Sequence, residues 1–219
     1  MNSDIASSLD CANHHANATP ADIKKLCEDV ITYGFNAAFV NPVYIALSKA
    51  TLLGRARVGT AFSFPLGQDT VEMKIFEAVE SIKLGADELD IVPNNGLVGT
   101  PEYLQEMKTI VEAARAVRGD IVIKFILETG YLDDEHIKLA ALAIVESGAD
   151  FVKICSGMGP RGASIADVTL VRSTIGHRAK IKVAGGIDTR AEAQEFLAAG
   201  VDRIGTSKAV EIVTVSLTN

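Results

Sequence analysis

The sequence predicts an α/β fold, a single-domain (β/α)8 TIM barrel that spans residues 1–219. A unit made of an amphipathic helix, a small residue with Asp and a short apolar strand recurs at 78–93, 143–157 and 192–207. Apolar segments alternate with helical segments along the whole chain, which is typical of parallel βαβ units. Eight such units fit into 219 residues near the lower size limit of a barrel.

Each strand is predicted from a short apolar run, and in the three repeated units this run follows a helix-stop glycine. Helices are expected in most of the gaps between strands, and a last helix is expected to begin near Ser207. The eight strands are predicted near residues 6–10, 36–41, 57–62, 87–92, 121–127, 150–155, 180–185 and 202–206.

Helix ends carry their own signals. Glycine stands where the helix of each repeated unit should stop, as a left-handed C-cap requires. Thr19-Pro20 and Thr100-Pro101 place a capping hydroxyl before a proline at the first helical position. Capping-box spacing, or something close to it, occurs at Asp69–Glu72, Ser164–Asp167 and Thr189–Glu192.

A doubly wound open sheet is the alternative arrangement of the same elements. That fold usually carries a G-x-G-x-x-G loop after its first strand. Here the first predicted strand is followed by "CANHHANATP", and no such loop occurs in the sequence. The pattern therefore favours the barrel.

Composition excludes several classes of protein. A net charge of −7 argues against binding to nucleic acid or to anionic membranes. The three cysteines include no C-x-x-C pair, so we expect a reducing, cytoplasmic setting. The first ten residues do not resemble a signal peptide, and no apolar run reaches the roughly 18 residues that span a bilayer.

Four charged residues occupy apolar strands. Side chains alternate between the two faces of a strand, so the strongly apolar set on each strand should face the helices. The opposite set then points into the barrel and contains Asp90, Lys124, Lys153 and Lys182. These side chains should converge near the carboxyl ends of the strands, where barrel enzymes hold their chemistry.

Purely structural roles for these residues stay open. A single lysine could extend its stem toward solvent, and Lys124 alone fits that reading as well as any other. The whole set could also be a buried ion-pair network without a catalytic role. Three lysines and one aspartate on the inward face of neighbouring strands nevertheless favour a functional site.

Two adjacent inward lysines have a definite chemical use. The charge of one lysine and the apolar walls would both disfavour protonation of the other lysine and lower its pKa. A neutral amine can attack a carbonyl and form a Schiff base, which then accepts electrons when a carbon–carbon bond breaks. Asp90 could transfer protons directly or through water.

Two glycine-containing turns suggest where an anionic group would bind. Backbone N–H groups after the seventh and eighth strands often form the phosphate site of such barrels. The candidates are Gly185 and Gly186 in "AGGI" and Gly205, Thr206 and Ser207 in "GTS", with Ser156 and Lys124 as further candidate substrate-binding residues.

From about residue 9 to its end, the chain resembles the class I deoxyribose-phosphate aldolases. The resemblance rests on long segments in the family's order: "FPLGQD", "GADELDIVP", "IKFILETGYL", "GADFVKICSGMGPRGAS", "IKVAGGIDT" and "RIGTS". It implies that Lys153 is the Schiff-base lysine, that Lys182 lowers its pKa and that Asp90 serves a proton relay. It also implies reversible cleavage of 2-deoxy-D-ribose 5-phosphate to acetaldehyde and D-glyceraldehyde 3-phosphate, without a metal or organic cofactor, by a homo-oligomer, a dimer in this family.

The chain departs from the family pattern around the expected pocket. "DCANH" stands where the family usually has Asp-His-Thr-Leu-Leu, so Ala12 lacks a hydroxyl. "ICSG" replaces Thr-Ser-Thr-Gly; Ile154 should point outward, whereas Cys155 and Ser156 should line the pocket mouth. Asp188 replaces an arginine near the phosphate region, and Lys208 replaces a second serine there and could return a positive charge.

Other readings of the same residues remain. Cys155 could be a nucleophile, but no histidine is placed to activate it, and a pocket wall is the simpler reading. His14-His15 could suggest a metal ligand pair, but we interpret them as loop residues. A related lysine-dependent aldolase with a different acceptor or donor aldehyde is an alternative function, as is a catalytically silent barrel that binds sugar phosphates.

Overall fold

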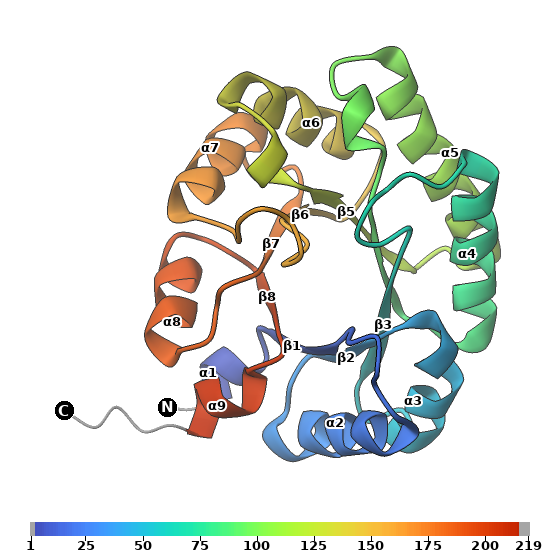
Figure 1. The fold of residues 1–219 in the computed structure, drawn as a ribbon, viewed down its shortest axis with the longest axis vertical. Coiled ribbons are helices and arrows are strands. Elements are labelled where there is room, and N and C mark those ends of the chain that lie inside the picture. Colours follow the sequence, from blue (N-terminus) through green and yellow to red (C-terminus); the bar gives the residue numbers. More distant parts are fainter. Residues whose placement is uncertain (1–2, 215–219) are drawn as a thin grey trace.

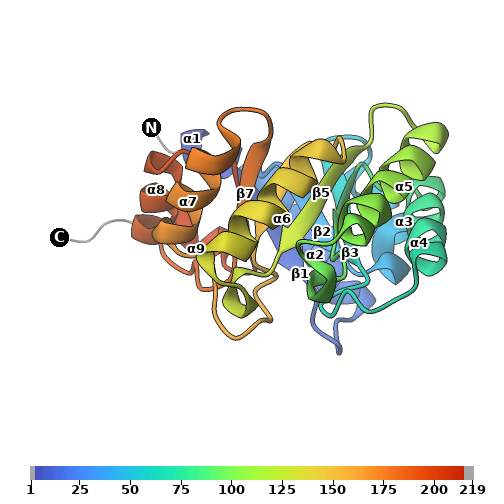
Figure 2. The same ribbon diagram turned by 90° about the horizontal axis from the view of Figure 1, so that it is seen from above.

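The computed structural model describes residues 3–214, and its eight parallel strands close into a barrel in the order β1 to β8. Helices surround this barrel as an outer layer (Figure 1), and the side view shows them packed against the strands (Figure 2). The predicted (β/α)8 barrel is thus confirmed. The strands are β1 Leu9–Asn13, β2 Ala37–Val40, β3 Arg57–Phe62, β4 Glu88–Ile91, β5 Val122–Leu127, β6 Phe151–Ile154, β7 Lys180–Ala184 and β8 Arg203–Thr206.

The helices follow the strands in the expected alternation, and three short 3₁₀ turns lie within the loops after β2, β4 and β5. These turns are η1 Pro42–Tyr44, η2 Asn95–Leu97 and η3 Thr129–Tyr131. The helices are α1 Ser3–Ala6, α2 Pro20–Tyr33, α3 Ile45–Leu52, α4 Val71–Leu84, α5 Pro101–Val117, α6 Asp134–Glu146, α7 Ile165–Ile175, α8 Arg190–Ala198 and α9 Ala209–Thr214.

The prediction for the first strand was wrong by three residues. Residues 3–6 form helix α1, and β1 begins at Leu9, where its register pairs Leu9 with Ile204 of β8. Ala6, the first residue of the predicted strand, lies in α1 and contributes to the core from there. The last helix also begins later than predicted, because the Thr206 hydroxyl first accepts the backbone N–H of Lys208 at 2.9 Å.

Most of the predicted helix signals are confirmed. Thr19 caps α2, and the boxes at Ser164–Asp167 and Thr189–Glu192 form as expected. Glycines 85, 148 and 200 after the repeated helices adopt positive φ values of 108°, 85° and 89°.

Two of the predicted caps differ in detail. The cap of α4 is Thr70, not Asp69, since its hydroxyl accepts the N–H of Met73. Thr100 occupies the N-cap position of α5, but its hydroxyl donates to the Leu97 carbonyl instead of capping the helix.

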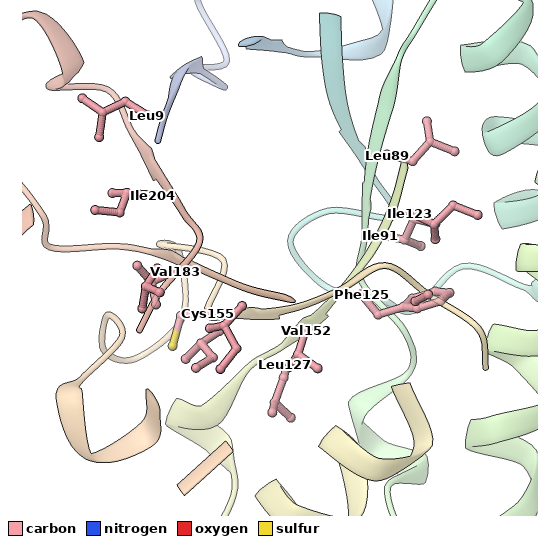
Figure 3. Close-up of a cluster of buried hydrophobic side chains, with 14 of the residues drawn as sticks. Leu9, Leu89, Ile91, Ile123, Phe125, Leu127, Val152, Cys155, Val183 and Ile204 are labelled. Carbon is pink, nitrogen blue, oxygen red and sulfur yellow. The ribbon is translucent and has the colours of Figure 1, made fainter. Parts of the chain in front are cut away.

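The main apolar core lies between the strands and the helices. Figure 3 shows Leu89, Ile123 and Phe125 on the side of β4 and β5 that faces the outer helices. All three are fully buried, as are Val152 and Ile154 of β6. Because alternation sends these apolar side chains outward, it sends the polar residues of the same strands into the barrel.

Inside the barrel, the ring of Phe39 depends on a glycine in the neighbouring strand. A Cβ atom on Gly59 would lie 2.2 Å from the ring atom Cζ of Phe39. The ring in turn lies beneath the ammonium of Lys182, 3.5 Å from Nζ to the ring centroid. Gly59 therefore leaves the space that allows an aromatic ring to cover the interior lysine.

We predict that Gly59→Ala lowers the free energy of unfolding by about 1–3 kcal/mol, because the ring must leave its position. The matched control is Gly119→Ala, where a Cβ atom meets nothing within 4 Å. Urea denaturation of both variants measures the difference. Equal stability of the two variants would contradict this account of Gly59.

Candidate active site

A cavity of about 230 Å³ opens at the carboxyl ends of the strands. Its walls come from the ends of β1, β6, β7 and β8 and from the loops that follow them, with further side chains from β2, β4 and the loop after β3. Lys153, Lys182 and Asp90 line this cavity, as do Ser156 and the two predicted glycine-containing turns. The structure therefore brings together most of the residues that the sequence singled out.

The carboxylate of Asp90 joins the two cavity lysines. Its Oδ2 accepts hydrogen bonds from Lys153 Nζ at 2.8 Å and from Lys182 Nζ at 2.9 Å. Lys182 is also 2.7 Å from Oδ2 of Asp10, whose other oxygen accepts from Asn36 at 2.7 Å. The two ammonium groups are thus held beside one another by shared carboxylates.

Lys124 lies too deep in the barrel for the substrate-binding role that was predicted for it. It is fully buried, and its Nζ lies 2.5 Å from Glu88 Oε2 and 3.2 Å from Asp90 Oδ1. The cavity wall is formed by Asp90, Lys153 and Lys182 instead. Lys124 is therefore placed to act on Asp90 and not on a bound substrate.

The environment of each buried charge shifts its pKa in a direction with a clear cause. Burial lowers the pKa of Lys153; Asp90 opposes this effect, while the charges of Lys182 and Lys124 add to it. Burial alone would raise the pKa of Asp90, but the three surrounding lysines hold it well below its usual range. Asp90 is therefore ionised, and Lys153 loses its proton more readily than a free lysine does.

His14 and Phe64 also line the cavity. His14 lies in the loop after β1, as predicted, but its place at the cavity was not predicted. The two rings lie 5.3 Å apart, and Lys153 Nζ is 5.7 Å from the centroid of Phe64. Burial and the charge of Lys153 lower the pKa of His14 to about 4, so its imidazole is neutral near pH 7. No metal-binding cluster of His, Cys, Asp or Glu occurs between residues 3 and 214.

The loops after β6 and β7 touch through glycines. Gly185 has a φ of 89°, and a Cβ atom there would lie 2.8 Å from Cα of Gly157 and 3.0 Å from Cα of Gly162. The Thr206 hydroxyl donates to the Ile187 carbonyl at 2.9 Å and so joins the turn after β8 to the same region. Gly205, Gly186 and Ser207 complete this part of the cavity wall.

Asp188 lies in the wall of this region, as its position in the sequence suggested. The backbone N–H of Asp188 donates to Glu192 Oε2 at 3.0 Å. This N–H group, at the start of α8, is therefore already engaged and is not available to a phosphate. A carboxylate and an occupied donor both make this edge of the cavity less favourable for a phosphate than the two turns alone suggest.

Cys155 does not line the cavity mouth, and that expectation was wrong. Its backbone takes a left-handed conformation with φ of 63°, which interrupts the alternation that places Lys153 inward. The thiol packs into the outer core (Figure 3), 3.1 Å from the Thr129 hydroxyl, and burial raises its pKa to about 11. Ser156 takes the place at the cavity wall, and Ile154 points outward as predicted.

Comparison with known proteins agrees with this geometry. The family model of the DeoC/LacD family aldolases matches residues 4–207. The chain belongs to this family. It is 42% identical over 212 residues to a deoxyribose-phosphate aldolase of Thermoanaerobacter sp. (strain X514), and the match covers 95% of both chains. A deoxyribose-phosphate aldolase of Thermococcus kodakarensis is also 42% identical, over 96% of both chains.

Solved structures of aldolases share the fold of this DeoC/LacD family member. The tetrameric deoxyribose phosphate aldolase from Aeropyrum pernix superimposes with a TM-score of 0.91 and 32% identity, over 97% of this chain and 91% of that one. The aldolase QR15 gives a TM-score of 0.89 and 33% identity, over 96% and 94%. Of the helices between residues 3 and 214, none combines the length and apolar character that crossing a membrane requires.

Proposed function

We propose that this protein is a Schiff-base aldolase that reversibly cleaves 2-deoxy-D-ribose 5-phosphate to acetaldehyde and D-glyceraldehyde 3-phosphate. The observation that carries the proposal is the pair of cavity lysines on one carboxylate, with Lys153 Nζ 2.8 Å and Lys182 Nζ 2.9 Å from Asp90 Oδ2. Burial and two neighbouring ammonium groups favour the neutral amine of Lys153, which is the form that attacks a carbonyl. The names of the curated relatives support the same substrate.

In this mechanism Lys153 Nζ attacks the C1 aldehyde of the open-chain sugar and, after loss of water, forms an iminium ion. Removal of the proton from the C3 hydroxyl then breaks the C2–C3 bond, and the electron pair moves into the iminium to give an enamine. Protonation at C2 and hydrolysis release acetaldehyde. Asp90 is hydrogen-bonded to the nucleophile and is placed to transfer these protons directly or through water.

The triose phosphate would lie between the turns after β7 and β8. Backbone N–H groups of Gly185, Gly186 and Ser207 are the proposed contacts of the phosphate, with Ser156 on the opposite loop. Neither a metal nor an organic cofactor takes part in the proposed reaction. We further propose a cytoplasmic homo-oligomer, a dimer from the family resemblance, whereas the relative from Aeropyrum pernix is tetrameric.

Borohydride reduction in the presence of acetaldehyde tests the proposal directly. Reduction of the iminium should attach an ethyl group to Lys153, which peptide mass mapping locates. We expect Lys153→Arg to lower kcat/KM for deoxyribose 5-phosphate at least about 10³-fold and to abolish labelling, because a guanidinium remains protonated. Labelling at another lysine, or an active Lys153→Arg enzyme, would contradict the assignment.

Removal of the Lys182 charge should shift the pH dependence. The pKa of Lys153 is lowered in the folded protein, so activity rises as pH increases through that pKa. Lys182→Leu removes one of the positive charges that lower the pKa of Lys153, and it leaves the carboxylate of Asp10 without its ammonium partner. We therefore expect the acidic limb of the kcat/KM profile to move to higher pH by about 1 unit. Lys182→Arg keeps the charge and is the matched control. An unmoved limb in the leucine variant would count against this role.

Asp188 should weaken binding of the phosphorylated substrate. We expect Asp188→Arg to lower KM for deoxyribose 5-phosphate about tenfold, through a new charge-assisted contact, and to leave KM for unphosphorylated deoxyribose unchanged. Glu112→Arg, an equal change of charge at an exposed position of α5, controls for net charge. Equal effects on both substrates would place Asp188 outside the phosphate site.

A further inference from the structure

A row of alternating charges crosses the barrel interior from its amino-terminal end to Lys153. Arg57, the half-exposed first residue of β3, donates from Nη1 to Glu88 Oε1 at 3.0 Å. The other oxygen of Glu88 accepts from Lys124 at 2.5 Å, and Lys124 lies 3.2 Å from Asp90 Oδ1. Asp90 then accepts from Lys153 through its second oxygen. Each charge in the row thus touches the next.

This row is shielded from solvent over most of its length. The exposed fractions of the Glu88, Asp90, Lys124 and Lys153 side chains are 1%, 0%, 0% and 5%. Salt screens exposed charges strongly but buried pairs much less, so each of these charges acts on its neighbours. Glu88 and Lys124 lie outside the cavity wall, so they act on the reaction through their charges and through the contact of Lys124 with Asp90 and not by touching a substrate.

We propose that Glu88 and Lys124 are positioning residues that set the protonation of the Schiff-base lysine through their buried charges and the contact of Lys124 with Asp90. The inference rests on the proposed role of Lys153. Together with Asp90, Lys153 and Lys182, these two residues form one network. In it, one oxygen of Asp90 lies beside Lys124, and the other accepts hydrogen bonds from the two cavity lysines.

Lys153 belongs to a cluster of six buried charges in contact with one another. Within residues 3–214, the ammonium groups of this cluster are those of Lys124, Lys153 and Lys182 and its carboxylates are those of Asp10, Glu88 and Asp90, so the loss of one group changes the net charge of the cluster by one unit. The charged and titratable groups that bound this space are His14 and Asp10 from β1 and its loop, Arg57 from β3, Glu88 and Asp90 from β4, Lys124 from β5 and Glu128 directly after it, Lys182 from β7 and Arg203 from β8.

The two positioning residues should act in opposite directions. Glu88→Gln removes a negative charge and leaves the interior with an excess positive charge, which disfavours protonated Lys153 and lowers its pKa. Lys124→Met removes a positive charge and leaves Glu88 without its closest buried partner, which raises the pKa of Lys153. A role in folding alone would give no such opposition.

The test is the pH dependence of kcat/KM for cleavage of deoxyribose 5-phosphate, which reports groups of the free enzyme. We expect the acidic limb to move down by about 0.5–1 pH unit in Glu88→Gln and up by a similar amount in Lys124→Met. The double variant Glu88→Gln/Lys124→Met should lie near the wild-type profile. Unmoved limbs, or shifts of both single variants in the same direction, would overturn the inference.

A surface variant keeps the test usable if the buried variants do not fold. Arg57 and Arg55 line the same cleft at the amino-terminal end of the barrel, but the Arg55 guanidinium donates to the Leu52 carbonyl. Arg57→Gln should move the acidic limb of the kcat/KM profile to higher pH by a few tenths of a unit, and the shift should be smaller at high salt. Arg55→Gln should leave the profile unchanged. Equal profiles for these two variants would overturn the inference.

Borohydride labelling with acetaldehyde separates this inference from the proposed function. Wild-type protein that is not labelled at Lys153 would refute the Schiff-base role, and the inference with it. Wild-type protein labelled at Lys153, together with variants whose pH profiles do not move, would refute the inference alone.

Discussion

The carboxylate of Asp90 is the centre on which the interior of this barrel depends. A charged group without exposed surface costs several kcal/mol unless partners compensate it. Here three ammonium groups, from β5, β6 and β7, surround one carboxylate from β4. Each lysine would be costly to bury alone, and so would the aspartate. Together they form a charged core inside a shell of apolar side chains.

The apolar shell is what allows this charged core to exist. Outward residues such as Leu89, Phe125 and Val152 pack the strands against the helices. Because the strands form a closed barrel, the inward side chains of the same strands meet near its axis. The ring of Phe39 lies 3.5 Å from Lys182 and 4.9 Å from Lys124, measured from each Nζ to the ring centroid. Two of the three lysines therefore contact an aromatic ring as well as carboxylates.

Strand alternation predicted correctly which side chains enter the barrel but not how deeply they lie, as Lys124 shows, and the prediction of direction failed where alternation stops. Asp90, Lys153 and Lys182 were placed correctly because each lies inside a regular strand. Cys155, two residues after Lys153, was misplaced because its left-handed backbone reverses the direction of its side chain. His14 was missed because it follows the end of β1, where only the tertiary contact with Phe64 brings it to the cavity.

The glycine contact between Gly185, Gly157 and Gly162 limits how this enzyme can diversify. Two loops meet there backbone to backbone, and a side chain at Gly185 would force them apart. A larger residue at Gly185 or Gly162 is therefore unfavourable, while Met158 and Asp188 on the same two loops line the cavity with exposed side chains. Laboratory evolution toward new aldehydes can change those two side chains without disturbing the contact between the loops.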